Sequence, residues 1–116
     1  MEAFDLASLV ARCGKGNDRY LEFIRKPTIS VGLYMLPTGA VDGQVPHSED
    51  EIYYVISGRG SIFVYNENRD VQAGSVIFVG AHVEHRFHSI VEDMTILVAF
   101  APAEYTNAPA TEKREG

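Results

Sequence analysis

The chain contains a single cysteine, Cys13, among its 116 residues. One cysteine cannot form an intramolecular disulfide, so the fold needs no oxidising compartment and a cytoplasmic location is expected. Long hydrophobic runs are also missing, because no apolar stretch approaches the roughly 18 residues of a membrane span. The first residues lack the positive and apolar regions of a secretory signal. These absences predict a soluble protein.

Basic residues are scarce. Ten Lys and Arg residues stand against sixteen Asp and Glu residues, which gives a net charge of −6. No basic stripe is present that could neutralise a row of phosphates. Nucleic acids and anionic membranes are therefore excluded as expected partners, and a small molecule is the expected one.

Helical patterns are nearly missing as well. Only residues 5–10 have a helical spacing: Asp5 can cap a short helix, and Leu6, Leu9 and Val10 share one face. The crossover helices that a parallel sheet requires are lacking, which excludes a parallel α/β fold.

Short apolar runs separated by turn residues fill most of the remaining chain. At 116 residues and 46% hydrophobic, the chain is expected to form one domain with one core. Strands at intervals of roughly 8–12 residues favour a sandwich or barrel of antiparallel sheets. The predicted strands are Tyr20–Ile24, Thr28–Leu36, Ile52–Ile56, Ser61–Tyr65, Val76–Val79, His85–Ile90 and Met94–Phe100.

One predicted strand is apolar on both faces. Ile52, Tyr54 and Ile56 alternate with residues on the face of Glu51, so a second surface must cover them. An exposed apolar stripe usually marks an interface, which predicts a homodimer. In the alternative, residues 1–25 fold back over the stripe and leave a monomer.

Two glycine-punctuated segments carry the functional information. The first runs from Gly39 to Glu51 and includes His47; the second runs from Gly74 to His85. Two imidazoles and a carboxylate brought together inside a barrel would form a divalent metal site with open positions.

The spacing of these segments resembles the two-part signature of the cupins, which are small jelly-roll barrels. The first part runs from Gly39 through His47 and Glu51 to Gly58, and the second from Gly74 through His85 to Ser89. The resemblance covers about residues 28–102. It implies an all-β antiparallel jelly-roll barrel. The helix and first strand in 1–27 precede this barrel, and the tail in 103–116, which has too few large apolar groups to pack, is expected to be partly mobile.

The chain departs from the family pattern at one ligand. Val45 stands where the family has its first histidine, so His47, Glu51 and His85 remain as metal ligands. Such a set satisfies a facial triad, for which Fe(II) is the simplest ion, with Zn, Mn, Ni or Cu as alternatives. A Val45→His variant should then complete the set. Gln44 offers an amide oxygen, but strand alternation would direct it away from the face of His47.

Several other polar residues receive more ordinary interpretations. Glu49 and Asp50 are expected to be solvated loop acids, His82 to shape the rim of the barrel, and His88 to face away from His85. The second part of the signature also has Gly80, His82 and Ser89 in place of the family's proline, glycine and asparagine.

Tyr53 lies two residues after Glu51 and is the candidate catalytic hydrogen-bond donor; filling the barrel is its alternative role. Strand parity predicts an apolar to aromatic cavity for a small neutral or aromatic oxygenated molecule. Its expected lining is Val31, Leu33, Met35, Val45, Tyr53 and Phe87.

Family resemblance therefore implies a mononuclear divalent-metal enzyme, dioxygenase-like, acting on a small oxygenated organic molecule. Cupins host several kinds of function. A non-catalytic binding or sensing protein and a cupin isomerase or lyase are the alternatives.

Overall fold

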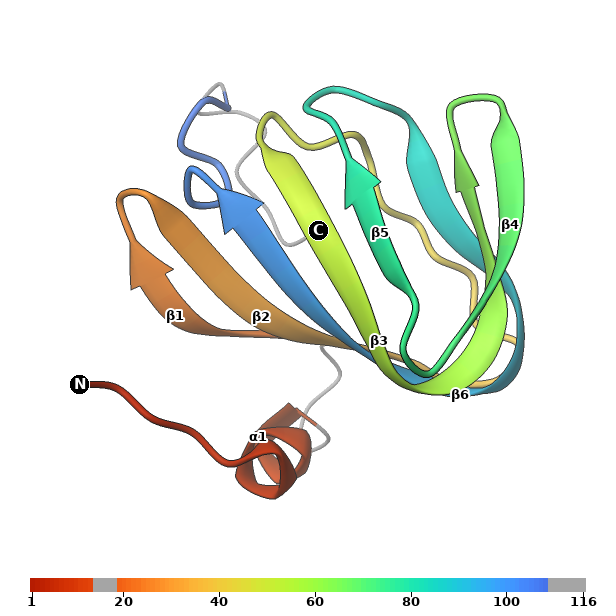
Figure 1. Cartoon of the computed structure of the whole chain (residues 1–116), viewed down its shortest axis with the longest axis horizontal. Helices are drawn as coiled ribbons and strands as arrows, with labels where there is room; N and C mark the ends of the chain where they lie inside the picture. Colours follow the sequence, from red (N-terminus) through yellow and green to blue (C-terminus); the bar gives the residue numbers. More distant parts are fainter. Residues whose placement is uncertain (14–18, 109–116) are drawn as a thin grey trace.

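The computed structural model describes residues 1–13 and 19–108 and shows a jelly-roll barrel of antiparallel strands with one short helix (Figure 1). The strands follow the order β1-β2-β6-β3-β4, and β5 pairs with β3. The elements are α1 (Leu6–Cys13), β1 (Tyr20–Lys26), β2 (Ile29–Leu36), β3 (Asp50–Val64), β4 (Glu67–Gln72), β5 (Val76–Val79) and β6 (His85–Ala101).

Two long strands, β3 and β6, form the centre of the barrel. Each replaces two of the strands predicted from the sequence, because the intervening turn residues bend the strand without ending it. The pairing of β3 with β6 shifts register three times between Val55 and Ser61. Gly58 lies at this bend with φ of +91°, and a Cβ there would lie 2.2 Å from the carbonyl oxygen of Asp93. Only glycine fits such an approach.

This bend folds the β3–β6 ribbon over on itself. Val64 lies thirteen residues along β3 from Glu51, and it pairs with His85 of β6. On a straight ladder, about 3.3 Å per residue would separate Glu51 from His85 by about 40 Å. In the folded ribbon, a Glu51 oxygen lies 2.9 Å from a His85 nitrogen. The bend therefore creates the candidate site.

The strand β4 was missed by the sequence patterns, which predicted no strand between Tyr65 and Val76. Its sequence, Glu67-Asn-Arg-Asp-Val-Gln72, is polar, and Val71 alone is buried. At the edge of the barrel, β4 is held by backbone pairing with β3 from Arg59↔Gln72 to Val64↔Glu67. Alternating hydrophobicity cannot reveal a strand that buries one side chain.

The barrel interior is packed with large apolar side chains. They belong to a cluster of buried residues that includes Tyr34, Leu36, Tyr53, Val55, Phe87, Ile96, Val98 and Phe100. Tyr53 and Phe87 face inward as expected, but Val31, Leu33 and Met35 do not. Leu33 instead packs beneath α1 with Leu9 and Cys13, and Met35 borders that second cluster. Both faces of β2 are apolar, so parity alone could not identify the inner one.

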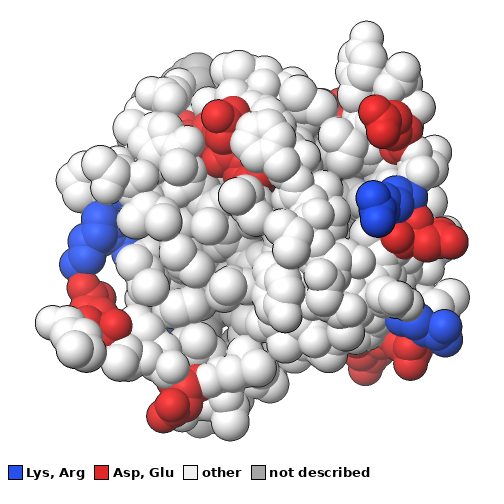
Figure 2. All heavy atoms as spheres, viewed as in Figure 1, with Lys and Arg blue, Asp and Glu red and all other residues white. Residues whose placement is uncertain are grey.

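An apolar patch remains exposed on the outer face of β3 and β5. Ile52 and Tyr54 are 47% and 43% exposed, and their cross-strand partners Phe78 and Val76 are 62% and 66% exposed. Helix α1 covers only the Ile56 end of the predicted stripe. In Figure 2, the charged side chains lie away from the middle of this face of the molecule, and the middle itself carries none. We call Ile52, Tyr54, Val76 and Phe78 the outer patch.

The homodimer remains a prediction, and the outer patch is the surface through which it would form. In sedimentation equilibrium, we expect a mass about twice 12.8 kDa for the natural chain and a monomer for Tyr54→Glu, because a buried unpaired carboxylate is costly. Tyr65→Glu is the control, since Tyr65 is 71% exposed outside the patch. A concentration-independent monomer mass for the natural chain would contradict the prediction.

Candidate metal site

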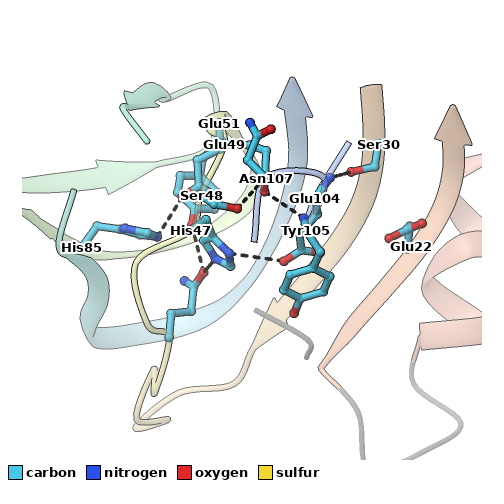
Figure 3. A network of polar contacts seen from close by, with 12 residues as sticks. Glu22, Ser30, His47, Ser48, Glu49, Glu51, His85, Glu104, Tyr105 and Asn107 are labelled. Atoms are coloured by element: carbon cyan, nitrogen blue, oxygen red, sulfur yellow. Dashed lines mark hydrogen bonds and ion pairs between the residues drawn. The ribbon is translucent and has the colours of Figure 1, made fainter. Parts of the chain in front are cut away.

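The side chains of His47, Glu51 and His85 meet inside one end of the barrel, as the sequence spacing predicted (Figure 3). His47 lies in the long loop between β2 and β3, Glu51 is the second residue of β3, and His85 begins β6. One ligand atom from each of the three lies within 4.8 Å of the others. The carbonyl oxygen of His47 also accepts a 2.6 Å hydrogen bond from the amide of His82, which ties the two loops together.

Glu51 and His85 bring two electron-rich atoms together in a buried setting. Both residues are 2% exposed, and His85 Nε2 lies 2.9 Å from Glu51 Oε1. His85 Nδ1 lies 2.8 Å from the carbonyl oxygen of Val83, to which it donates its proton. In the neutral imidazole, Nε2 then presents a lone pair to the carboxylate. Only a proton or a cation between the two atoms makes this contact favourable.

Within the described residues, His85 Nε2 and Glu51 Oε1 have no other polar group that satisfies them. Across residues 1–13 and 19–108, His85 Nε2 and both carboxylate oxygens of Glu51 lack a partner in hydrogen-bonding geometry. Buried polar atoms without partners are rare in folded proteins and indicate an ion or a functional role. This donor set fits a divalent metal, because imidazole nitrogen and carboxylate oxygen suit several such ions.

The two histidines differ in their proton affinity. Burial lowers the pKa of His47. Burial also opposes the protonated form of His85, but the adjacent carboxylate of Glu51, which would hold a proton on Nε2, outweighs it and raises the pKa of His85. A proton therefore competes with a metal mainly at His85, beside Glu51.

His47 contacts two side chains through its two ring nitrogens. Its Nδ1 lies 3.3 Å from Glu104 Oε2, and its Nε2 lies 3.0 Å from Gln44 Oε1. A proton on Nδ1, facing Glu104, would leave Nε2 free to bind a metal. The ring of Phe100 packs edge-on against the imidazole of His47, with the two ring centres 4.9 Å apart, and restricts the rotation of the imidazole.

Val45 and Gln44 point in the directions opposite to those predicted. Val45 is 53% exposed, whereas Gln44 reaches His47. The prediction was wrong because it assumed strand alternation, and residues 40–47 do not form a strand. The proposal that Val45→His completes the ligand set loses its basis, since that side chain faces outward.

Tyr53, the candidate catalytic residue, lies next to the three ligands. Its side chain is fully buried, its hydroxyl donates a 3.1 Å hydrogen bond to Gln44 Oε1, and its ring centre lies 6.0 Å from that of His85. Burial and the charge of Glu51 raise the pKa of Tyr53 well above its ordinary value. Tyr53 therefore remains a proton donor, and its role in catalysis remains a prediction.

Glu49 was expected to be a solvated acid, and this expectation was wrong. It is 1% exposed and accepts 2.8 Å hydrogen bonds from the amides of Tyr105 and Asn107, as well as one from the Ser48 hydroxyl. Glu49 lies between the ligands His47 and Glu51, so it fastens residues 103–108 over the site. Residues 109–116 of the predicted mobile tail lie outside the described residues.

Glu104, on this fastened segment, is a site residue that sequence reasoning missed. It is 1% exposed, and burial raises its pKa to about 8, with the charges of Glu22, Glu51 and Glu49 adding to the effect. Its segment contains few large apolar residues and no recognised motif. The sequence therefore carried no signal that Glu104 would lie against His47.

The remaining polar residues lie near the predicted positions. Asp50 and His82 are exposed, and Asp50 Oδ1 accepts a 2.8 Å hydrogen bond from the amide of Ala81. His88 contacts Asn68 at 2.8 Å on the outside of the barrel.

Comparison with known families identifies the fold family. The cupin domain family matches residues 32–100, which is more than half of the chain. The chain is a cupin. An uncharacterized protein of Streptomyces coelicolor is 47% identical over 104 residues, covering 90% of this chain and 99% of that protein.

Solved structures share the fold of this cupin at low sequence identity. The TT1209 protein of Thermus thermophilus aligns with a TM-score of 0.71 and 22% identity, covering 89% of this chain and 99% of that one. The DMSP lyase DddQ of Ruegeria pomeroyi aligns with a TM-score of 0.65 and 16% identity, covering 72% of this chain and 47% of that one. Glu104 lies beyond residues 32–100, which the family model matches.

Removing the Glu49 carboxylate should release residues 103–108. A Glu49→Ala variant leaves two backbone amides without an acceptor, at a cost of about 1–3 kcal/mol for each that stays buried. We expect a lower free energy of unfolding and faster hydrogen exchange at the amides of Tyr105 and Asn107. Glu84→Ala, a change at an exposed site, is the control. Unchanged exchange at both amides would contradict the role of Glu49.

Glu104 should make the metal-free protein less stable at high pH. Its folded pKa of about 8 exceeds the ordinary value of 4.5. The stability that it contributes is therefore full below about pH 4.5 and is lost as the pH rises through 8. In the presence of a chelator, the melting temperature of Glu104→Gln relative to the natural chain should rise between pH 5 and pH 9. Glu84→Gln should show no such change, and a constant difference for Glu104→Gln would refute the assignment.

Proposed function

We propose that this cupin binds one divalent metal ion through His47, Glu51 and His85. The observation that supports the proposal most strongly is the buried contact of His85 Nε2 with Glu51, 2.9 Å apart and otherwise unsatisfied. Two histidines and one carboxylate leave coordination positions open for a substrate. Fe(II) is the proposed ion, and Zn, Mn, Ni and Cu remain the alternatives.

We further propose that the bound metal serves a dioxygenase-like reaction on a small oxygenated organic molecule. A bound metal ion supplies Lewis-acid and redox chemistry at its open positions. The side chains of His47, Glu51 and His85 are at most 5% exposed, which supports a site shielded from bulk water and a small substrate. Tyr53, protonated and buried beside the site, would shift its hydroxyl hydrogen bond from Gln44 to an oxygen of the substrate when the substrate binds.

A lyase reaction is the second candidate. The DMSP lyase of Ruegeria pomeroyi has the same fold at 16% identity, and metal-assisted proton abstraction needs no dioxygen. A barrel that only binds or senses a small molecule would show metal binding without turnover.

Partners and location stay predictions. The net charge of −6 supports a small-molecule partner over a nucleic acid, and the single cysteine supports a cytoplasmic location. No helix within 1–13 and 19–108 has both the length and the hydropathy needed to cross a bilayer.

Metal binding is tested with matched histidine variants. After anaerobic loading with Fe(II) and desalting, elemental analysis should find one iron per chain in the natural protein and in His88→Ala. His85→Ala should lose the metal, because it removes a nitrogen ligand beside Glu51. Binding should weaken as the pH falls through the raised pKa of His85, since the histidine must be neutral to bind.

Retention of one iron by His85→Ala would contradict the proposed site. Oxygen uptake by the iron-loaded protein with small hydroxylated and carbonyl compounds then separates the reactions. Uptake that His85→Ala abolishes supports a dioxygenase, whereas turnover without uptake supports a lyase.

A further inference from the structure

We propose that the side-chain oxygen of Gln44 is a fourth protein ligand to the metal, held in place by Asp42. This inference rests on the proposed metal site and assigns a residue at which the cupin signature has no ligand. The family's first histidine falls at Val45, which is 53% exposed. Gln44, one residue earlier in a loop, fills the place that Val45 leaves.

Asp42 is the anchor of this arrangement. It is 5% exposed and accepts hydrogen bonds from the Tyr34 hydroxyl at 2.6 Å, the Phe87 amide at 2.8 Å and the Gln44 side-chain amide at 2.8 Å. Tyr34 and Phe87 belong to the barrel interior. The loop that carries Gln44 is therefore fastened to two strands of the barrel, β2 and β6.

These contacts determine which end of the Gln44 amide faces the site. A carboxylate accepts hydrogen bonds and cannot donate them, so the end beside Asp42 must be the NH₂ group. The carbonyl oxygen then points to the other side, where the Tyr53 hydroxyl donates to it at 3.1 Å. A flipped amide would place two acceptors against each other at Asp42 and lose the bond from Tyr53.

The position of this oxygen suits a ligand. Gln44 Oε1 lies 3.0 Å from His47 Nε2, and Glu51 Oε1 lies 2.9 Å from His85 Nε2. Two ligand atoms that each lie about 2.1 Å from one ion, at a right angle, are about 3 Å apart. Both pairs therefore have the separation of neighbouring ligands. Amide oxygens are accepted ligands of hard divalent cations.

The Gln44 oxygen also accepts a hydrogen bond from the Tyr53 hydroxyl. When an amide oxygen binds a cation, its second lone pair can still accept a hydrogen bond. Tyr53 would thus orient Gln44 from the barrel side while Asp42 orients it from the loop side. Both contacts would position the ligand before the metal arrives, and such supporting contacts are commonly worth about 10- to 100-fold in metal affinity.

The test uses Co(II) as the probe, with calorimetric titration for affinity and visible absorption for the ligand set. Relative to the natural chain, Gln44→Ala should bind Co(II) at least about tenfold more weakly. Gln44→His should bind at least as tightly as the natural chain and change the Co(II) spectrum, because nitrogen replaces oxygen. Gln44→Met removes the oxygen with little change in size and replaces the alanine variant if that variant does not fold.

Val45→His is the matched control, since it adds the same side chain one residue away on the exposed side of the loop. We expect its Co(II) affinity and spectrum to equal those of the natural chain. Natural affinity and spectrum in Gln44→Ala or Gln44→Met would overturn the inference, as would a Val45→His variant that behaves as predicted for Gln44→His. Failure of the metal site itself is distinguishable: the natural chain would not bind Co(II), or His85→Ala would bind it unchanged.

Discussion

The candidate site depends on one constraint, the folding of the β3–β6 ribbon over on itself. Glu51 and His85 belong to opposite ends of a paired ladder and meet only because both strands bend at the same level. Gly58 permits this bend by allowing its backbone to approach Asp93 too closely for any side chain. Gly58, which ends the first part of the signature, therefore contributes to the site through the path of the backbone.

Bringing these groups together concentrates negative charge in the interior. Glu49, Glu51 and Glu104 are each at most 2% exposed, and the protein accommodates each of them differently. Glu49 is satisfied by two backbone amides, and burial raises the pKa of Glu104 so that it holds its proton. Glu51 alone faces a histidine lone pair, with neither of its oxygens satisfied by a hydrogen bond. A cation between Glu51 and His85 would satisfy both groups, which supports the proposed metal site.

The sequence predicted the elements that have a regular physical pattern. The barrel and the meeting of His47, Glu51 and His85 followed from spacing that resembles a known family. The directions of Gln44 and Val45 did not, because they lie in a loop where side chains do not alternate. Strand β4 and the buried Glu49 and Glu104 were missed because backbone pairing and contacts between distant segments place them. Such contacts have no local signature in the sequence.

The most direct measurement is anomalous diffraction, at the absorption edge of the bound metal, from crystals of the metal-loaded protein. The account predicts one strong peak within bonding distance of His47, Glu51 and His85, with the side-chain oxygen of Gln44 completing the protein ligands. A fully loaded protein with no peak at this position, or with Glu51 hydrogen-bonded to a protonated His85 and the metal bound elsewhere, would contradict it.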